Sequence, residues 1–379
     1  MRILHTADWQ IGAHLAFLGE GAAAAREKRF ETVATLVDLA VAEAVDCVLV
    51  AGDVFDSPDL SEASLRRVLT LLEGLGDVPV VLLPGNHDPS VPGGVWDRAL
   101  WKHVPSNVLR ALTPRELEVR EDFAVYPCPV RQKSSRLDPT RWIPKRADGD
   151  QRYRVGLAHG ALDVLPHRGN FPIGTGRAEE AGLDYLALGD WHTPMVQGRI
   201  AYSGSPEPGS FRERDSGHAL IVDLPEPGAE PQIEQRRVAA LAWQKLVRRI
   251  DHEADLGALA RALHPLRSEL VLDLQVEIGD TQLVAAVEDF VEELRAEAFF
   301  LRSDCQALPQ RSLDDLGQPL ASELDAELLQ ALHDLENGGS RQNAGALQVD
   351  GAALTLEELV EARRQLSLLA QRASDGATR

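Results

Sequence analysis

The chain has 379 residues and a formal net charge of −20, with 59 acidic residues against 39 lysines and arginines. The length favours one large domain and a smaller one, and the acidic balance excludes a generic polyanion binder, so any nucleic-acid contact must be local. Three widely spaced cysteines exclude a disulfide framework, and the absence of a leader-like N-terminus and of an 18-residue apolar run favours a soluble, cytoplasmic protein without membrane contact.

The first 225 residues alternate apolar runs with amphipathic helical patterns. Buried strands followed by polar turns are predicted within residues 46–56 and 78–88, and helices at 31–45 and 61–76. This alternation predicts a parallel sheet buried on both faces. Later runs lie closer together, and we expect them to form a second sheet of antiparallel character; they are residues 123–130, 153–160, 183–192, 198–205 and 217–224.

The remaining sequence divides into three parts. Residues 226–239 are rich in Pro, Gly and Glu and predict a linker or an exposed hairpin after a domain of residues 1–225. Residues 240–312 show the pattern of a small α/β unit. Residues 313–379 predict two amphipathic helices whose leucine stripes either close an internal core or bind a partner.

Five apolar runs of the first domain end in oxygen or imidazole donors. The donors are Asp8 and Gln10; Asp53 and Asp56; Asn86, His87 and Asp88; His159; Asp190 and His192. One such residue is usually a cap, but five in succession at the carboxyl ends of strands favour a shared ligand site. The set suits two divalent cations that share one carboxylate, which is the chemistry of phosphoester hydrolysis. The sequence contains no HExxH, GxSxG or GxxxxGK[ST] motif.

The blocks DWQ, GDVFD, GNHD, HG and GDWH, followed by YSGS, resemble the five-part signature of the calcineurin-like metallophosphoesterases. Within that superfamily, ILHTADWQIG, VLVAGDVFDS and LALGDWH are most similar to the SbcD-type DNA repair nucleases, the partners of SbcC-type coiled-coil ATPases. The resemblance implies an α/β fold, a four-layer αββα sandwich, with a smaller α/β capping domain at residues 240–312. It also implies that the C-terminal helical pair, residues 313–379, docks on the ATPase.

The resemblance also implies roles for individual residues. The first metal site would comprise Asp8, Gln10, Asp53 and His192, and the second metal site Asp53, Asn86, His159 and Asp190, with Asp53 bridging. His87 would lie beside the scissile phosphate and stabilise charge or protonate the leaving oxygen. Asp56 and Asp88 would orient His87 or bind the amides of the turn.

Residues 10 and 190 depart from the family pattern, which has histidine at both. Gln10 is a weaker, neutral oxygen donor, and Asp190 adds a negative charge. More oxygen and less nitrogen favour Mn²⁺, with Mg²⁺ as the alternative, and we expect the first metal site to be the weaker. In the alternative interpretation, Gln10 points away from the metal, hydrogen-bonds neighbouring groups and leaves its place to a water molecule.

Residues 128–154 hold eight lysines and arginines against three aspartates, so they predict either a phosphate contact beside the site or an ordinary surface loop. Arg131, Lys133 and Arg136 are the candidate phosphate contacts. Trp191 is a candidate for stacking on a base or for packing at the rim of the site.

Three functions are compatible with the sequence. The first is a metal-dependent DNA exonuclease or endonuclease with DNA and an SbcC-like ATPase as partners, either as a single chain or as a homodimer. The second is a phosphodiesterase for a small phosphoester or a cyclic nucleotide, which suits the acidic surface. The third is a DNA-end scaffold with reduced catalysis. The large region beyond residue 225 favours the first, because a small substrate requires no such addition.

Overall fold

The computed structural model describes residues 1–165, 170–213, 215–308, 348–349 and 352–353. The chain divides into two compact units. Unit 1 comprises Met1–Leu246, Ala260–Leu274 and Phe290–Ser303, and unit 2 comprises Val247–Leu259, Gln275–Asp289 and the chain from Asp304 onward. The expected C-terminal helices lie outside the described residues, which include there only β16 (Gln348–Val349) and β17 (Ala352–Ala353). The domain boundaries expected from the sequence therefore stay a prediction.

The first sheet of unit 1 has six strands in the order β12-β11-β1-β2-β3-β4. Four of them run parallel: β1 (Arg2–Thr6), β2 (Cys47–Val50), β3 (Val80–Leu82) and β4 (Val108–Arg110). Two further strands extend the sheet beyond β1: β11 (His218–Asp223) pairs antiparallel with β1, and β12 (Gln232–Arg237) pairs antiparallel with β11. Residues 226–239, expected to be a linker or hairpin, thus include the edge strand β12.

Two long helices, α1 (Ala22–Ala42) and α2 (Glu62–Leu72), connect the parallel strands. Helix α2 begins where predicted, at Ser61, whose side chain accepts a hydrogen bond from the Ser64 N–H (3.1 Å) and so caps the helix. Helix α1 begins nine residues before the predicted start, because the alanine-rich stretch before residue 31 favours helix without an apolar period. Short 3₁₀ helices occupy Ala16–Gly21, Glu73–Leu75, Val95–Asp97 and Ala99–His103.

The second sheet also has six strands, in the order β5-β6-β7-β8-β10-β9. They are β5 (Leu117–Arg120), β6 (Phe123–Cys128), β7 (Tyr153–His159), β8 (Tyr185–Gly189), β9 (Met195–Gln197) and β10 (Ile200–Tyr202). The expected antiparallel character is wrong for the inner strands β6, β7, β8 and β10, which are all parallel. The long segment after β6 and helix α3 (Arg177–Ala181) before β8 supply the crossovers that parallel pairing requires.

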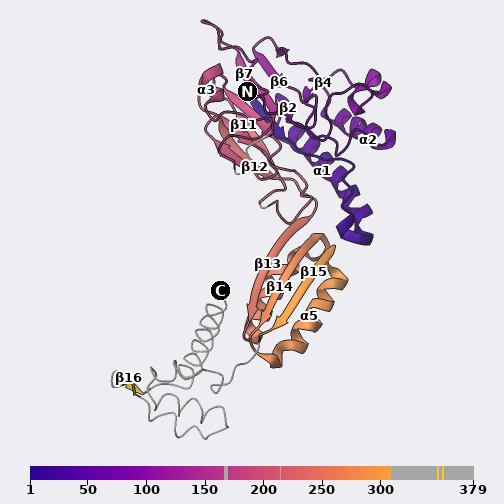
Figure 1. The fold of residues 1–379 in the computed structure, drawn as a ribbon, viewed down its shortest axis with the longest axis vertical. Helices are drawn as coiled ribbons and strands as arrows, with labels where there is room; N and C mark the ends of the chain where they lie inside the picture. The colour runs from indigo at the N-terminus through magenta and orange to yellow at the C-terminus, as the bar shows by residue number, and fades with distance from the viewer. Residues whose placement is uncertain (166–169, 214, 309–347, 350–351, 354–379) are drawn as a thin grey trace. The chain divides into compact units, whose positions relative to one another are not determined.

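The two sheets and the helices form four layers, which confirms the predicted αββα sandwich. Helices α1 and α2 pack on one face of the first sheet, and Figure 1 shows α3 on the opposite side of the two sheets. Between the sheets lies a buried core that includes Ile3, Leu49, Val81, Val125, Leu157 and Ala187. Side chains alternate between the two faces of each strand, which explains why the first sheet is buried on both faces. Val48, for example, packs in the core under the helices, and its neighbour Leu49 packs in the core between the sheets.

The rest of the described chain forms a three-stranded sheet of order β13-β14-β15 with two helices. Its strands are β13 (Ala242–Ile250), β14 (Leu270–Ile278) and β15 (Phe300–Ala307). Its helices are α4 (Glu253–Leu263) and α5 (Val284–Glu297), with 3₁₀ turns at His264–Glu269 and Thr281–Leu283. The described residues 242–307 thus contain both strands and helices, whereas the expected domain of residues 240–312 stays a prediction. Within the described part of the chain, no helix has the length and apolar character needed to cross a membrane.

Candidate metal centre

The carboxyl ends of the parallel strands lie at one edge of each sheet. The register pairs Thr6 with Val50 and Val50 with Leu82, so the turns after β1, β2 and β3 begin side by side. Backbone hydrogen bonds continue past the strands, from the Asp8 N–H to the Gly52 carbonyl (3.0 Å) and from the Gln10 N–H to the Asp53 carbonyl (2.9 Å). The first two ligand turns are therefore held against each other by the backbone.

Four candidate ligands have left-handed backbone conformations that non-glycine residues rarely adopt. The φ angles are 55° for Asp8, 46° for Gln10, 50° for Asp53 and 92° for Asp190. Such residues cost about 1–3 kcal/mol each and are concentrated at functional sites. In this protein they turn the side chains that follow β1, β2 and β8 toward a common point.

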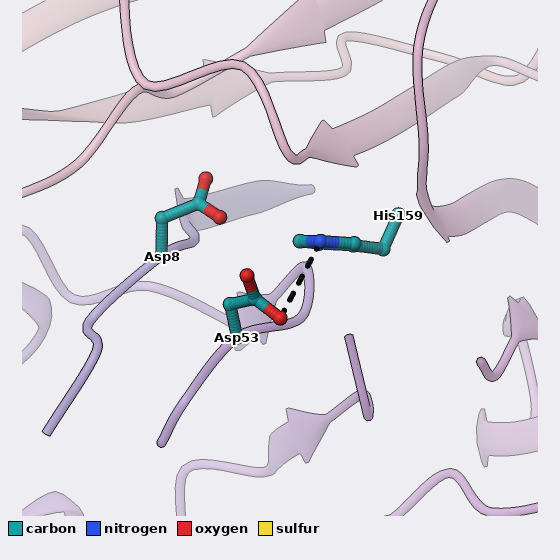
Figure 2. A group of neighbouring side chains, drawn as sticks. All are labelled: Asp8, Asp53 and His159. Atoms are coloured by element: carbon teal, nitrogen blue, oxygen red, sulfur yellow. Dashed lines mark ion pairs between the residues drawn. The ribbon is translucent and has the colours of Figure 1, made fainter. Parts of the chain in front are cut away.

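Asp8, Asp53 and His159 converge at that point (Figure 2). One potential ligand atom from each lies within 4.8 Å of the others, and their exposures are 0%, 1% and 0%. Burial raises the pKa of Asp8 to about 6, and the neighbouring Asp53 adds to the effect against the attraction of two histidines. Buried carboxylates this close repel one another, so the group fits a divalent cation, which would relieve the repulsion.

His159 presents one ring nitrogen to the acidic residues. Its Nδ1–H donates to the carbonyl oxygen of Ala51 (2.9 Å), which leaves Nε2 facing Asn86 Oδ1 (2.7 Å), Asp53 Oδ1 (3.5 Å) and Asp190 Oδ1 (3.6 Å). Burial lowers the pKa of His159, but the attraction of Asp53, Asp8 and Asp190 outweighs it and raises the pKa well above the usual value. Oxygen atoms surround Nε2, so a positive charge, a proton or a metal ion, is required there. The structure thus brings all four residues of the expected second metal site together.

The other expected ligands gather around His192. Its Nε2 lies 3.9 Å from Asp8 Oδ1 and 3.3 Å from Gln10 Nε2. Gln10 is 8% exposed, and it is its amide nitrogen that faces the ring of His192. Rotation of the amide by 180° exchanges nitrogen and oxygen and would present the oxygen that a metal requires.

The sequence prediction missed Glu213. Its Oε1 lies 3.1 Å from Nδ1 of His192, on the side of the ring away from Asp8. Burial lowers the pKa of His192, but the Glu213 hydrogen bond and the Asp8 charge outweigh burial and raise it to about 9. Glu213 lies in an irregular loop between β10 and β11, where no periodic pattern in the sequence marks it.

His87 is the exposed member of the group, with 42% of its side chain accessible. Its backbone N–H donates to Asp53 Oδ1 (2.9 Å), and its Nδ1 lies 3.3 Å from the Asp56 carbonyl oxygen and 3.6 Å from Asp56 Oδ1. Asp56 therefore contacts the ring of His87. A substrate can reach this ring because it is exposed.

Asp88 differs from Asp56 in being completely buried. Its two oxygens accept hydrogen bonds from the Gly85 N–H (2.6 Å) and the Phe55 N–H (3.1 Å). Burial raises the pKa of Asp88 well above the usual value, and the Asp53 charge adds to this effect. Asp88 thus binds the amides of the turns that follow β2 and β3.

The candidate substrate-binding residues come from two segments, the loop after β6 and the turn after β8. Arg131, Lys133 and Arg136 are exposed on the loop after β6. Arg131 lines a pocket of about 480 Å³ together with residues of the segment between β3 and β4, among them Ser90 and Trp96. Trp191 is half-buried and packs against the outer core of the second sheet.

Comparison with known proteins gives the class of this chain. The sequence profile of the calcineurin-like phosphoesterases matches residues 1–222, which cover both sheets except β12. The chain belongs to this family of phosphoester hydrolases, which use divalent metals. The buried Asp8, Asp53 and His159 agree with that assignment.

Several relatives are named as nuclease subunits or as DNA repair proteins. A subunit of the nuclease SbcCD of Bacillus subtilis is 37% identical over 271 residues, which cover 61% of this chain and 68% of the relative. The corresponding SbcCD subunit of Rhodobacter capsulatus is 28% identical over 359 residues, 78% of this chain and 85% of the relative. The DNA double-strand break repair protein Mre11 of Aeropyrum pernix is 36% identical over 260 residues, 62% of this chain and 61% of the relative.

Proposed function

We propose that this chain is a two-metal phosphodiesterase that cleaves DNA, an exonuclease or endonuclease acting in the repair of DNA ends. The observation that carries the proposal is the convergence of the buried Asp8, Asp53 and His159 next to the exposed His87, whose backbone N–H donates to Asp53 Oδ1. The buried groups suit cations and the exposed ring suits a substrate. Relatives named as nuclease subunits support DNA as that substrate.

Two sets of residues would hold the cations. Asp8, Gln10, Asp53 and His192 would form the first metal site, and Asp53, Asn86, His159 and Asp190 the second. Bound divalent cations would polarise the phosphoryl group and activate water for attack on phosphorus. The oxygen donors Gln10 and Asp190 favour Mn²⁺ over softer metals, with Mg²⁺ as the alternative, and the neutral Gln10 makes the first metal site the weaker one.

His87 would act on the substrate directly. Its Nδ1–H is held by the Asp56 carbonyl oxygen, so Nε2 is the nitrogen left for a substrate. In its protonated form the ring would stabilise charge on the phosphate and donate the Nε2 proton to the leaving oxygen. Asp56 keeps the ring in this orientation, and Asp88 fixes the turn that carries Asn86 and His87.

The chain as a whole is acidic and would repel DNA phosphates, so DNA would have to be bound by a local basic surface. Arg131, Lys133 and Arg136 are exposed and would contact phosphates, and Trp191 would stack on a base at the site. Residues 240–312 would form the smaller α/β capping domain. Residues 313–379 would dock on a coiled-coil ATPase, and a homodimer is compatible with this assembly.

Two observations favour other functions. The net charge of −20 suits a phosphodiesterase for a small phosphoester or a cyclic nucleotide, which needs no basic surface. The replacement of two family histidines by Gln10 and Asp190 suits a DNA-end scaffold with reduced catalysis. Both alternatives keep the fold. The phosphodiesterase differs from the nuclease in what is cleaved, and the scaffold differs in cleaving slowly or not at all.

One experiment separates the three functions. The purified chain is incubated with Mn²⁺ and either end-labelled DNA, double- or single-stranded, or bis-p-nitrophenyl phosphate. His87→Ala is tested in parallel, with the exposed His103→Ala as the matched control. A nuclease cleaves DNA and loses roughly 10²- to 10⁴-fold in rate only in His87→Ala. Cleavage of the small ester alone indicates the second function, and inertness toward both indicates the scaffold.

A further inference from the structure

The loop between β10 and β11 contacts both the backbone carbonyl and the imidazole ring of His192. Its carbonyl oxygen accepts hydrogen bonds from the Ser205 N–H (3.0 Å) and from the Ser216 hydroxyl. Its ring Nδ1 lies 3.1 Å from Glu213 Oε1. Since a carboxylate can only accept, Nδ1 carries the hydrogen and Nε2 is left toward Gln10 and Asp8.

Glu213 is itself fixed by the loop. Its second oxygen, Oε2, accepts a hydrogen bond from the Gly209 N–H (3.0 Å), and its own N–H donates to the Ser210 carbonyl (3.1 Å). Only 12% of its side chain is exposed. Each carboxylate oxygen therefore serves one donor. A glutamine at this position could not serve both, because an amide has a single acceptor oxygen.

A buried arginine ties this loop to the turn after β1. Arg29 on α1 is 2% exposed, and it donates from Nη1 to the Trp9 carbonyl (2.9 Å) and from Nη2 to the Pro208 carbonyl (3.3 Å). Trp9 stands between Asp8 and Gln10. A Cβ at Gly209 would lie 2.7 Å from Arg29 Nη2, so the glycine permits this close approach.

The same loop is also anchored by an aromatic residue. The ring of Phe211 packs against Trp243 and Phe17, with centroids 5.3 and 6.2 Å away. Phe211 lies two residues before Glu213, and all three rings belong to unit 1. The loop that carries the Glu213 carboxylate is thus anchored by the contacts of both Arg29 and Phe211.

We propose that Glu213 is a positioning residue that orients His192 so that Nε2 joins Asp8 and Gln10 in the first metal site. The inference rests on the proposed metal site and not on the identity of the substrate. A histidine held by a carboxylate through one nitrogen is a fixed and more basic ligand at the other, and loss of such a partner typically weakens metal binding about 10- to 100-fold.

The test measures Mn²⁺ binding to the full chain by calorimetry. Glu213→Gln is expected to weaken the first metal site about 10- to 100-fold and to change the second less than about threefold. Glu213→Asp keeps the charge but withdraws the carboxylate, so its Mn²⁺ affinity at the first metal site is expected to lie between those of the wild type and Glu213→Gln. It provides a second readout if the glutamine variant does not fold. Asp215→Asn removes an exposed carboxylate of the same loop and is the matched control.

A double-mutant cycle decides whether Glu213 acts through His192. In the His192→Ala background, Glu213→Gln should cause no further loss of Mn²⁺ affinity. The inference is overturned if the two losses add, or if neither Glu213→Gln nor Glu213→Asp changes Mn²⁺ affinity. Failure of the proposed function has a different outcome: a wild-type chain that cleaves no DNA can still bind Mn²⁺ and show the dependence on Glu213.

Discussion

The Nδ1–H of His159 donates to the carbonyl oxygen of Ala51 across 2.9 Å. This bond joins the end of β7 in the second sheet to the end of β2 in the first, and it leaves Nε2 toward Asp53. Two glycines make room for the contact. A Cβ at Gly189 would lie 2.1 Å from the Ala51 oxygen, and a Cβ at Gly52 would lie 2.3 Å from Nδ1 of His159. The fold therefore determines which nitrogen His159 offers to a metal.

Gly52→Ala is expected to displace His159. Gly52 has a φ of 94°, so alanine adds backbone strain to the collision with the ring. We expect the free energy of unfolding to fall by about 2–5 kcal/mol, and Mn²⁺ affinity to fall with it. Gly149→Ala is the matched control, since Gly149 has a φ of 84° and no neighbour within 4 Å, so only the strain of about 1–2 kcal/mol should remain. Urea unfolding and Mn²⁺ titration measure both effects, and equal losses in the two variants would contradict this account.

Asp56 and Asp88 are expected to differ when each is replaced by alanine. Asp88→Ala leaves the buried N–H groups of Gly85 and Phe55 without their acceptor, so it should cost about 2–5 kcal/mol of stability. Asp56→Ala removes a half-buried contact of His87 and should slow hydrolysis about tenfold while the stability changes by less than about 1 kcal/mol. Thermal unfolding and hydrolysis of bis-p-nitrophenyl phosphate separate the two. A stable, inactive Asp88→Ala would assign Asp88 a direct catalytic role instead.

Lys133→Ala and Arg136→Ala are expected to weaken DNA binding equally for all sequences. Each removes one exposed charge of the proposed phosphate-binding surface. The slope of log affinity against log salt should fall by about 0.7–0.9 for each phosphate that is no longer neutralised. Fluorescence anisotropy at several salt concentrations gives the slope, with Arg66→Ala on α2 as an exposed-charge control. An unchanged slope in both variants would assign residues 128–154 to an ordinary surface loop.

His5 should make the protein less stable in mild acid. It is fully buried, with Nδ1 2.8 Å from the Tyr185 hydroxyl and Nε2 3.2 Å from the Leu188 carbonyl oxygen. Burial lowers the pKa of His5 to about 3. Between pH about 6.5 and 3 the unfolded chain binds a proton at His5 that the folded chain does not, so stability falls as the pH falls.

The measurement is the free energy of unfolding against pH for the wild type and for His5→Gln. The wild type should lose up to about 1.4 kcal/mol per pH unit more than the variant between pH 6.5 and 3. Above pH 7 the two slopes should coincide. Parallel curves from pH 7 to pH 4 would show that His5 is protonated in the folded protein.

Much of the fold, and the convergence of Asp8, Asp53 and His159, could be predicted because the relevant signals are local. Asp8, Asp53 and His159 each follow a short apolar run, and the parallel register of β1 and β2 then brings the first two together. The pairing within the second sheet was mispredicted, since closely spaced strands do not reveal whether a chain returns as a hairpin or crosses over. Glu213 was missed for a related reason: its role depends on loop contacts with Gly209 and His192 that leave no pattern in the sequence.

The central claim is that Asp53 is shared by two metal sites, and Mn²⁺ titration of the full chain with Asp53→Asn beside the wild type tests it most directly. Calorimetry at neutral pH should give two Mn²⁺ per wild-type chain, one bound more weakly than the other, and the variant should lose affinity at both. A wild-type chain that binds one Mn²⁺ or none, or an Asp53→Asn variant that still binds two as tightly, would contradict the account.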